Sequence, residues 1–270
     1  MDSTKKYWVG VGIGLSAFVV VIIGLNHYMN ILVAPPSANT SATTAVATTT
    51  DEMTPVAPLV TRASTTTSVP FPINPADNIA SFTFSGVYLS NDTLTAQTNA
   101  DIVHLTSLLG GGTYDNYDLY NGIANDYALI GEGKRSYEYY NQAISIHPQK
   151  GLAYVNLAHL MSQLGAYQTA ADAFKKAVTV EPGMLEYHVE RLAYLTEQFP
   201  KETSVIERAL TDVSKQFGDT PAILSIKARW LTGEKQYALA IQTWQTVKKL
   251  SPTDRQVAID AEIARLQAKQ

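Results

Sequence analysis

The chain has 270 residues, a net charge of −4, no cysteine, and a hydrophobic share of 46% that is ordinary for a globular protein. The lack of cysteine excludes disulfides, thiolate zinc sites and cysteine nucleophiles. The acidic balance argues against a protein that binds nucleic acid, because such proteins usually present a basic patch.

Residues 7–25 (YWVGVGIGLSAFVVVIIGL) contain no charged side chain. A helix of this length spans about 28 Å, which is close to the thickness of the hydrocarbon core. We therefore predict a single transmembrane helix over residues 7–28. Lys5 and Lys6 precede it and the next basic residue is Arg62. The positive-inside rule then places residues 1–6 in the cytoplasm and the rest of the chain outside it.

A cleaved signal peptide is the alternative to this anchor. The apolar core of a signal peptide is usually 7–15 residues long, and Pro35 and Pro36 directly follow the small residues near Ala34. Both features favour the anchor, and both interpretations leave the following residues outside the cytoplasm. Gly10 and Gly14 have the spacing that lets two membrane helices pair in a homodimer, although glycine is also common in unpaired membrane helices.

Residues 34–70 are mostly Thr, Ala, Pro and Ser. Such a segment cannot bury enough apolar surface to offset the entropy of ordering, so we predict a disordered linker that acts as a stalk. Residues 71–114 follow as a short N-terminal cap segment. Within it, residues 81–85 alternate like a strand, and Asn91 or Asp92 can cap a helix over about 93–109 that ends at three glycines.

Beyond residue 114 the sequence repeats itself with a period of about 34 residues, which lies in the range that marks repeat architectures. Five positions of the first unit recur in the second with similar side chains. They are Tyr120, Ala124, Tyr140, Ala143 and Pro148, which correspond to Tyr154, Ala158, Phe174, Ala177 and Pro182. A further shift, by two periods plus two positions, carries the second unit onto the fourth, where Ala158, Tyr167, Ala170, Phe174 and Pro182 correspond to Ala228, Tyr237, Ala240, Trp244 and Pro252. Small residues at these places permit close packing of two antiparallel helices.

This pattern resembles the tetratricopeptide repeat (TPR) family, which has the same period. The resemblance implies an all-α TPR-like superhelix of about four helical hairpins over residues 115–270. We assign the repeats to residues 117–150, 151–184, 185–220 and 221–254, and a capping helix to 255–270. The third unit departs from the family, because it is about two residues longer, carries Pro200 in its turn and lacks a clear terminal proline.

In TPR proteins the first helix of each pair lines a concave groove that binds extended peptides or helices. Carried over to this sequence, the resemblance places five polar side chains in that partner-binding groove: Asn121, Asn125, Asn156, His159 and Gln163. An amide can both donate to and accept from a peptide bond. Glu186 and Glu190 stand where chaperone-binding TPR domains carry basic residues, so a basic or polar partner segment is expected.

No catalytic or metal-binding pattern stands out, and we predict no cofactor and no enzymatic activity. The expected function is a membrane-tethered adaptor or scaffold that binds protein partners on the extracytoplasmic side, in a bacterial cell envelope. Two alternatives remain. One is a self-assembling structural subunit of the envelope, and the other is a module that binds cell-wall glycan, which exposed aromatic side chains in the groove would favour.

Overall fold

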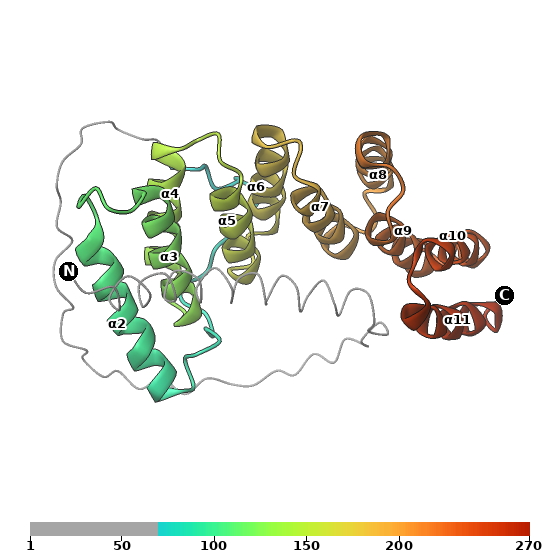
Figure 1. Cartoon of the computed structure of the whole chain (residues 1–270), viewed down its shortest axis with the longest axis horizontal. Coiled ribbons are helices and arrows are strands. Elements are labelled where there is room, and N and C mark those ends of the chain that lie inside the picture. Colours follow the sequence, from blue (N-terminus) through green and yellow to red (C-terminus); the bar gives the residue numbers. More distant parts are fainter. Residues whose placement is uncertain (1–69) are drawn as a thin grey trace.

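The computed structural model describes residues 70–270. Within them the chain forms ten α-helices and no regular strand (Figure 1). In chain order these are α2 (Asp92–Leu108), α3 (Asn116–Leu129), α4 (Gly133–Ile146), α5 (Leu152–Gln163), α6 (Tyr167–Val180), α7 (Leu185–Gln198), α8 (Thr203–Phe217), α9 (Pro221–Gly233), α10 (Tyr237–Leu250) and α11 (Thr253–Gln267).

Eight of these helices form four consecutive pairs, α3–α4, α5–α6, α7–α8 and α9–α10. The pairs follow one another along a single row from the N-terminal to the C-terminal end of the described chain (Figure 1). This is the all-α TPR-like arrangement that the sequence predicted for this part of the chain.

The second pair shows why the repeat pattern produces this packing. Ala158 on α5 and Ala170 on α6 are fully buried, so the two helices approach closely, and Phe174 fills the space beside them with 1% of its surface exposed. Gly165 ends α5 with a φ of +75°, a left-handed conformation that glycine adopts without steric cost. The chain therefore reverses between the helices within a few residues.

The buried apolar residues separate into two clusters. One is centred on α2 to α6, and the other runs from α7 to α11. Phe199 packs against both clusters, directly before Pro200 in the turn of the third pair. The departure of the third unit from the family pattern thus coincides with a division of the core.

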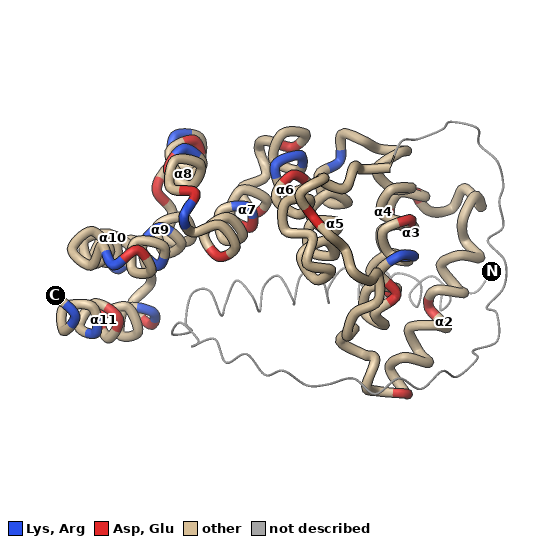
Figure 2. Tube along the Cα trace, turned by 180° about the vertical axis from the view of Figure 1, so that it is seen from behind, with Lys and Arg blue, Asp and Glu red and all other residues tan. Residues whose placement is uncertain are grey.

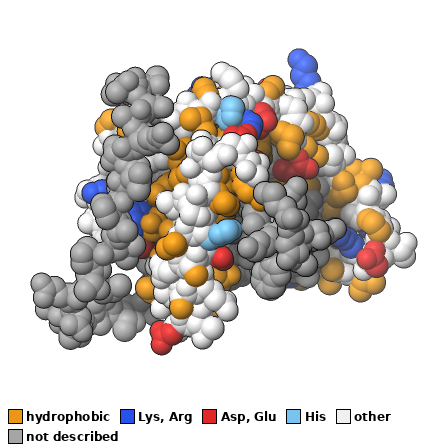
Figure 3. All heavy atoms as spheres, turned by 60° about the vertical axis from the view of Figure 1, so that its left-hand side comes forward, with side chains coloured by type: hydrophobic (Ala, Val, Ile, Leu, Met, Phe, Trp, Pro, Cys, Tyr) orange, Lys and Arg blue, Asp and Glu red, His pale blue; other side chains and the backbone are white. Residues whose placement is uncertain are grey.

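Both ends of the repeat array are covered by a helix. At the N-terminal end α2 packs on α3, with Ile102 and Leu105 buried and Asn91 accepting the backbone N–H of Leu94 as the N-cap. Viewed from this end, hydrophobic side chains lie among many uncharged ones and charged side chains are few (Figure 3). At the C-terminal end α11 buries Ile259, Ile263 and Leu266 against α10, on the face that the sequence predicted.

Residues 71–88, which we call the strap, cross the helices without forming a helix of their own. The predicted strand at 81–85 forms one isolated bridge, between Thr83 and Glu132, and no sheet. The strap backbone lies so close to the turn between α3 and α4 that this turn needs glycine. A Cβ atom on Gly131 would stand 2.2 Å from the carbonyl oxygen of Phe84, and one on Gly133 would stand 2.3 Å from that of Phe82.

The other predictions for the N-terminal part concern residues that the structure does not describe. The cytoplasmic segment 1–6, the transmembrane helix at 7–28, the Gly10–Gly14 pair and residues 34–69 of the linker all lie outside residues 70–270. Between residues 70 and 270 no helix is both long enough and apolar enough to cross a membrane.

Candidate functional site

The first helices of the second and third pairs are joined by a partly exposed side-chain contact. Nε2 of His159 on α5 lies 2.7 Å from a carboxylate oxygen of Glu190 on α7, and both side chains are partly open to solvent. The edge of the His159 ring packs against Phe174, with 5.2 Å between the ring centres. The contact therefore places an imidazole ring and a carboxylate side by side on the face formed by these helices.

Acidic groups dominate this part of the face. Glu186 is exposed on the first turn of α7, one turn before Glu190. The described chain has no lysine or arginine before Lys134, and the basic side chains gather toward the C-terminal helices (Figure 2). A carboxylate ligand would be repelled here, whereas a basic or polar segment would be attracted.

Two of the predicted groove residues, Asn121 and Asn125, are buried on α3, with 4% and 7% of their surface exposed. The amide of Asn121 donates to the carbonyl oxygen of Tyr117 at 2.9 Å. The carbonyl of Asn125 accepts the hydroxyl of Tyr140 on α4. Burial raises the pKa of Tyr140, so this hydroxyl keeps its proton and acts as the donor. Asn125 thereby joins the two helices of the first pair.

The remaining predicted residues lie on α5. Asn156 is buried with 3% of its surface exposed, whereas His159 and Gln163 are exposed. In the described part of the chain, the Oδ1 atoms of Asn121 and Asn156 have no hydrogen-bond donor within reach. A buried amide oxygen without a donor costs about 1–3 kcal/mol, so a donor that reaches either atom gains a corresponding free energy.

The structure thus divides the five predicted residues into two groups. His159 and Gln163 are accessible from solvent, and the three asparagines lie beneath the surface, where Asn121 and Asn125 already have partners in the chain. Whether these residues contact a partner stays a prediction. Burial of the asparagines was not foreseen, because it depends on how Tyr140 and the neighbouring helices close over them.

A second feature that the sequence did not reveal is the contact of the strap with the second helices. Tyr137 donates to the carbonyl oxygen of Phe71 at 2.6 Å, and Asn141 accepts the Phe71 backbone N–H at 2.5 Å, both from α4. The Phe71 ring meets Tyr154 on α5 edge to face, with 5.8 Å between ring centres. On α6, Thr169 accepts the backbone N–H of Asn74 at 2.9 Å. The strap therefore fills the space between α4 and α6, over α5.

The carboxylate of Asp77 completes this contact at the start of α6. It accepts the backbone N–H groups of Gln168 and Thr169 at 3.0 and 2.6 Å, and the Thr169 hydroxyl at 2.6 Å. The N-cap residue of α6, Ala166, has no side chain able to make such bonds. Asp77 therefore caps from a distant part of the chain, where the helix dipole also favours a negative charge.

The described residues contain no group of three or more His, Asp or Glu side chains that could hold a metal ion. The tyrosines of the described chain that could stack on sugars are buried or half-buried, with one exception. Tyr117 and Tyr154, at the first helices, expose 2% and 3% of their surface, and Tyr167 is the one aromatic residue among the large exposed apolar side chains of residues 70–270. The described surface does not favour glycan binding.

Comparison with known proteins supports the fold alone. No protein-family profile and no curated protein sequence matches this chain. Among solved structures, yeast Tom70 superposes with a TM-score of 0.51 at 14% identity, over 69% of this chain but only 40% of Tom70. The TPR protein TTC0263 of Thermus thermophilus matches with a TM-score of 0.46 at 17% identity, over 65% of this chain and 96% of its own.

Proposed function

We propose that this chain is a protein-interaction adaptor that binds a basic or polar segment of a partner across the first helices of its TPR-like domain. The observation that carries the proposal is a pair of acidic side chains one turn apart on α7, the exposed Glu186 and the half-buried Glu190, of which Glu190 contacts His159 on α5. A rigid helical array presents such a face to a partner, and charge complementarity would select the partner and speed its association.

The proposal extends to the setting of the domain. The uncharged stretch at residues 7–25, preceded by Lys5 and Lys6, supports a single membrane anchor with the adaptor on the extracytoplasmic side. The Thr- and Pro-rich residues 34–70 would then separate the adaptor from the membrane. A bacterial cell envelope is the location that we propose.

The test is capture of a partner by the full chain, in detergent, from crosslinked membranes of the source organism. Glu186→Lys combined with Glu190→Lys reverses the charge of the face, and we expect it to abolish capture. Asp101→Lys changes an exposed carboxylate on α2 and is the matched control, which should capture the partner like wild type. Circular dichroism of each variant verifies the helical content.

An equal yield from all three proteins would refute binding through this face. Asn125→Ala and Asn156→Ala together test the buried asparagines separately. Their loss should be judged against the stability of the variant, because Asn125 also joins α3 to α4 through Tyr140. A partner lost by this variant while it stays folded would assign the asparagines to binding.

A further inference from the structure

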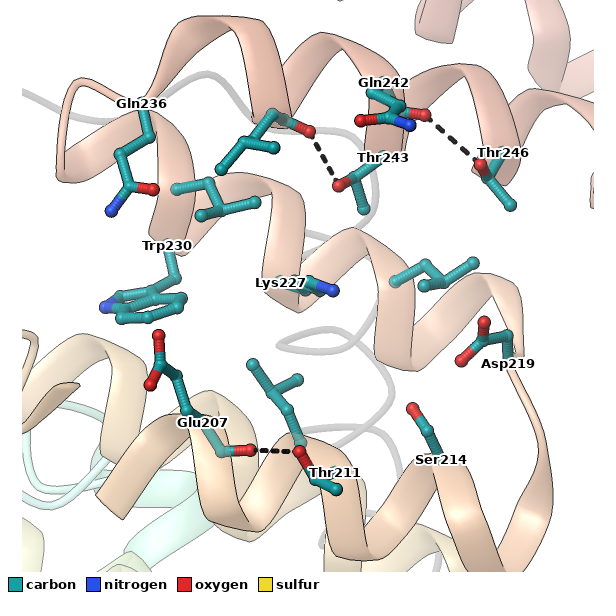
Figure 4. A pocket seen from close by; sticks show the side chains of 14 residues that line it. Glu207, Thr211, Ser214, Asp219, Lys227, Trp230, Gln236, Gln242, Thr243 and Thr246 are labelled. Atoms are coloured by element: carbon teal, nitrogen blue, oxygen red, sulfur yellow. Dashed lines mark hydrogen bonds between the residues drawn. The ribbon is translucent and has the colours of Figure 1, made fainter. Parts of the chain in front are cut away.

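A cavity of about 750 Å³ opens in the C-terminal half of the domain. Its walls come from α8 and α10 and its floor from α9 (Figure 4), and we call it the C-terminal groove. None of residues 70–270 crosses it. Trp230, Leu224 and Leu231 contribute apolar surface from α9, and each exposes only 5% of its area, so the floor is firmly packed beneath the opening.

This groove is the repeat equivalent of the place where the strap binds. The helices α4, α5 and α6 correspond to α8, α9 and α10 after a shift of two repeat periods plus two positions. After this shift, the first and last residues of corresponding helices agree to within one position. The strap runs between α4 and α6 over α5, as the groove runs between α8 and α10 over α9. Two equivalent sites therefore exist on the second helices, and the chain itself fills one of them.

The correspondence holds for the individual side chains that hold the strap. Tyr137, Asn141, Tyr154, Thr169 and Asp172 each contact residues 71–74 through a hydrogen bond or a ring contact. The residue at the equivalent position of the later repeat lines the C-terminal groove in every case. These counterparts are Glu207, Thr211, Leu224, Leu239 and Gln242.

Three threonine hydroxyl groups of the groove are arranged to accept hydrogen bonds from a peptide backbone. Thr211, Thr243 and Thr246 donate to carbonyl oxygens of their own helices at 2.8, 2.7 and 3.2 Å (Figure 4). Their oxygens therefore offer only lone pairs to a ligand. Thr169 accepts the backbone N–H of Asn74 in this way while its proton is bonded to Asp77.

The differences between the two sites indicate what the occupant must carry. Tyr137 donates to a carbonyl oxygen of the strap, but its counterpart Glu207 can only accept, so a ligand must present a donor there. Asp219 adds a second carboxylate, against the one ammonium group of Lys227. Leu224 replaces Tyr154 and leaves more room for an apolar side chain. These features fit a ligand with a large apolar residue beside a basic one.

We propose that the C-terminal groove binds an extended segment of a partner protein, anchored by an aromatic or aliphatic side chain next to a lysine or arginine. A second copy of this chain is not the expected source, because its own strap is already held by its α4 and α6. The proposal rests on the role in protein binding but not on the α5–α7 face, so each surface is tested by its own variants.

The experiment measures fluorescence anisotropy of two labelled peptides with the full chain in detergent. The probes are acetyl-Arg-Phe-Pro-Ile-Asn-Pro, built on the strap sequence, and its counterpart with Glu in place of Arg. We expect saturable binding of the Arg peptide and about tenfold weaker binding of the Glu peptide, because of Glu207 and Asp219. Equal affinity of the two, or no binding of either, overturns the proposal.

Two substitutions on α10 locate the site. Thr243→Trp fills the groove and should abolish binding, whereas Gln245→Trp adds the same side chain at an exposed position outside it and should leave binding unchanged. Glu207→Lys should reverse the preference between the two peptides. Binding that survives Thr243→Trp in a protein with unchanged circular dichroism would contradict the assignment.

A photocrosslinking residue in place of Thr243 identifies the occupant directly. An adduct with the Arg peptide, competed by excess unlabelled peptide, supports the partner segment. An adduct with residues 1–69 of the same chain, or with a second copy, overturns it, because the groove would then serve an intramolecular or self-association contact.

Discussion

The space between α4 and α6 and the groove between α8 and α10 are equivalent in the repeat, yet only the first holds a described segment of the chain. The helices that form them match in length and register. What differs is the set of five contact side chains. They are Tyr137, Asn141, Tyr154, Thr169 and Asp172 at the first site, and Glu207, Thr211, Leu224, Leu239 and Gln242 at the second. The comparison shows that a pair of second helices can hold an extra segment of this chain across the helix between them.

The comparison also shows how the ends of the domain are stabilised. The N-terminal pairs gain bonds from the strap, which is far away in the sequence. The C-terminal pairs rely on contacts between neighbouring helices and on α11. The two halves should therefore respond differently to the same kind of substitution, and four measurements exploit this.

The largest difference is expected between two glycines that stand one repeat apart. Gly131 and Gly165 have φ values of +83° and +75°, so alanine is strained at both, by about 1–2 kcal/mol. At Gly131 the added Cβ would also collide with the strap carbonyl of Phe84, but at Gly165 it meets no atom within 4 Å. We expect urea unfolding to report a loss of about 3 kcal/mol for Gly131→Ala.

Gly165→Ala should lose only about 1 kcal/mol in the same measurement, the part that both substitutions share. The difference between the two variants is the cost of pushing the strap away. Equal losses would mean that the strap adds nothing to the stability of the first repeats.

The second measurement removes the distant cap of α6. Asp77→Ala leaves the N–H groups of Gln168 and Thr169 without their acceptor and should destabilise the protein by about 2 kcal/mol. It should also speed hydrogen exchange at these two amides toward the rate at the start of α10, whose N-cap residue Gln236 makes no side-chain bond. The backbone amides of α10 serve as the internal reference, since their rates should not change.

The third measurement is the pH dependence of stability, and it concerns His188 on α7 in the third pair. Burial lowers the pKa of His188 below the ordinary value of about 6.5, although its bond to the carbonyl oxygen of Pro182 opposes the shift. The native state therefore favours the neutral ring, and the unfolded chain binds the proton more readily. Stability should be full above about pH 6.5 and should fall as the pH drops toward the lowered pKa of the native state.

Thermal unfolding at pH 8 and pH 5 tests this directly. His188→Gln should reduce the loss of stability between the two pH values, and His104→Gln on the exposed surface of α2 should not. A pH dependence identical in His188→Gln and wild type would assign the acid response to other groups.

The smallest effect is expected from an ion pair beside the C-terminal groove. Lys201 lies 2.9 Å from Glu234 and connects the turn of the third pair to the end of α9, but its side chain is 81% exposed. Lys201→Ala should cost less than about 1 kcal/mol, and added salt should reduce the difference from wild type. A larger, salt-independent loss would show that this contact, rather than helix packing, positions α8.

Much of the helical array could be predicted from the sequence, because the residues that recur in each repeat are those that pack neighbouring helices together or form the turns between them. Ala158, Ala170 and Phe174 each have the size that the packing of neighbouring helices requires. Gly165 adopts the backbone conformation that the turn requires. The capping face of α11 followed from the spacing of Ile259, Ile263 and Leu266 for the same reason.

The strap could not be predicted in this way. Its bonds join residues far apart in the chain, and no periodic pattern marks Asn141 or Thr169 as acceptors for it. The C-terminal groove could not be predicted for a related reason. It is recognised as a binding site only by comparison with the equivalent site that holds the strap. The candidate partner-binding residues were predicted by type, but the burial of Asn121, Asn125 and Asn156 depends on packing that a single sequence does not specify.

The path of the strap has a mechanical consequence whenever the domain is pulled from its N-terminal side. Any tension on the segment that precedes residue 71 enters the fold at Phe71, between α4 and α5, and not at the free end of the array. The load is first borne by several hydrogen bonds to α4 and α6, which share it before either helix is pulled from its neighbours. The helix α2 follows these bonds in the chain, so such a pull would reach it last.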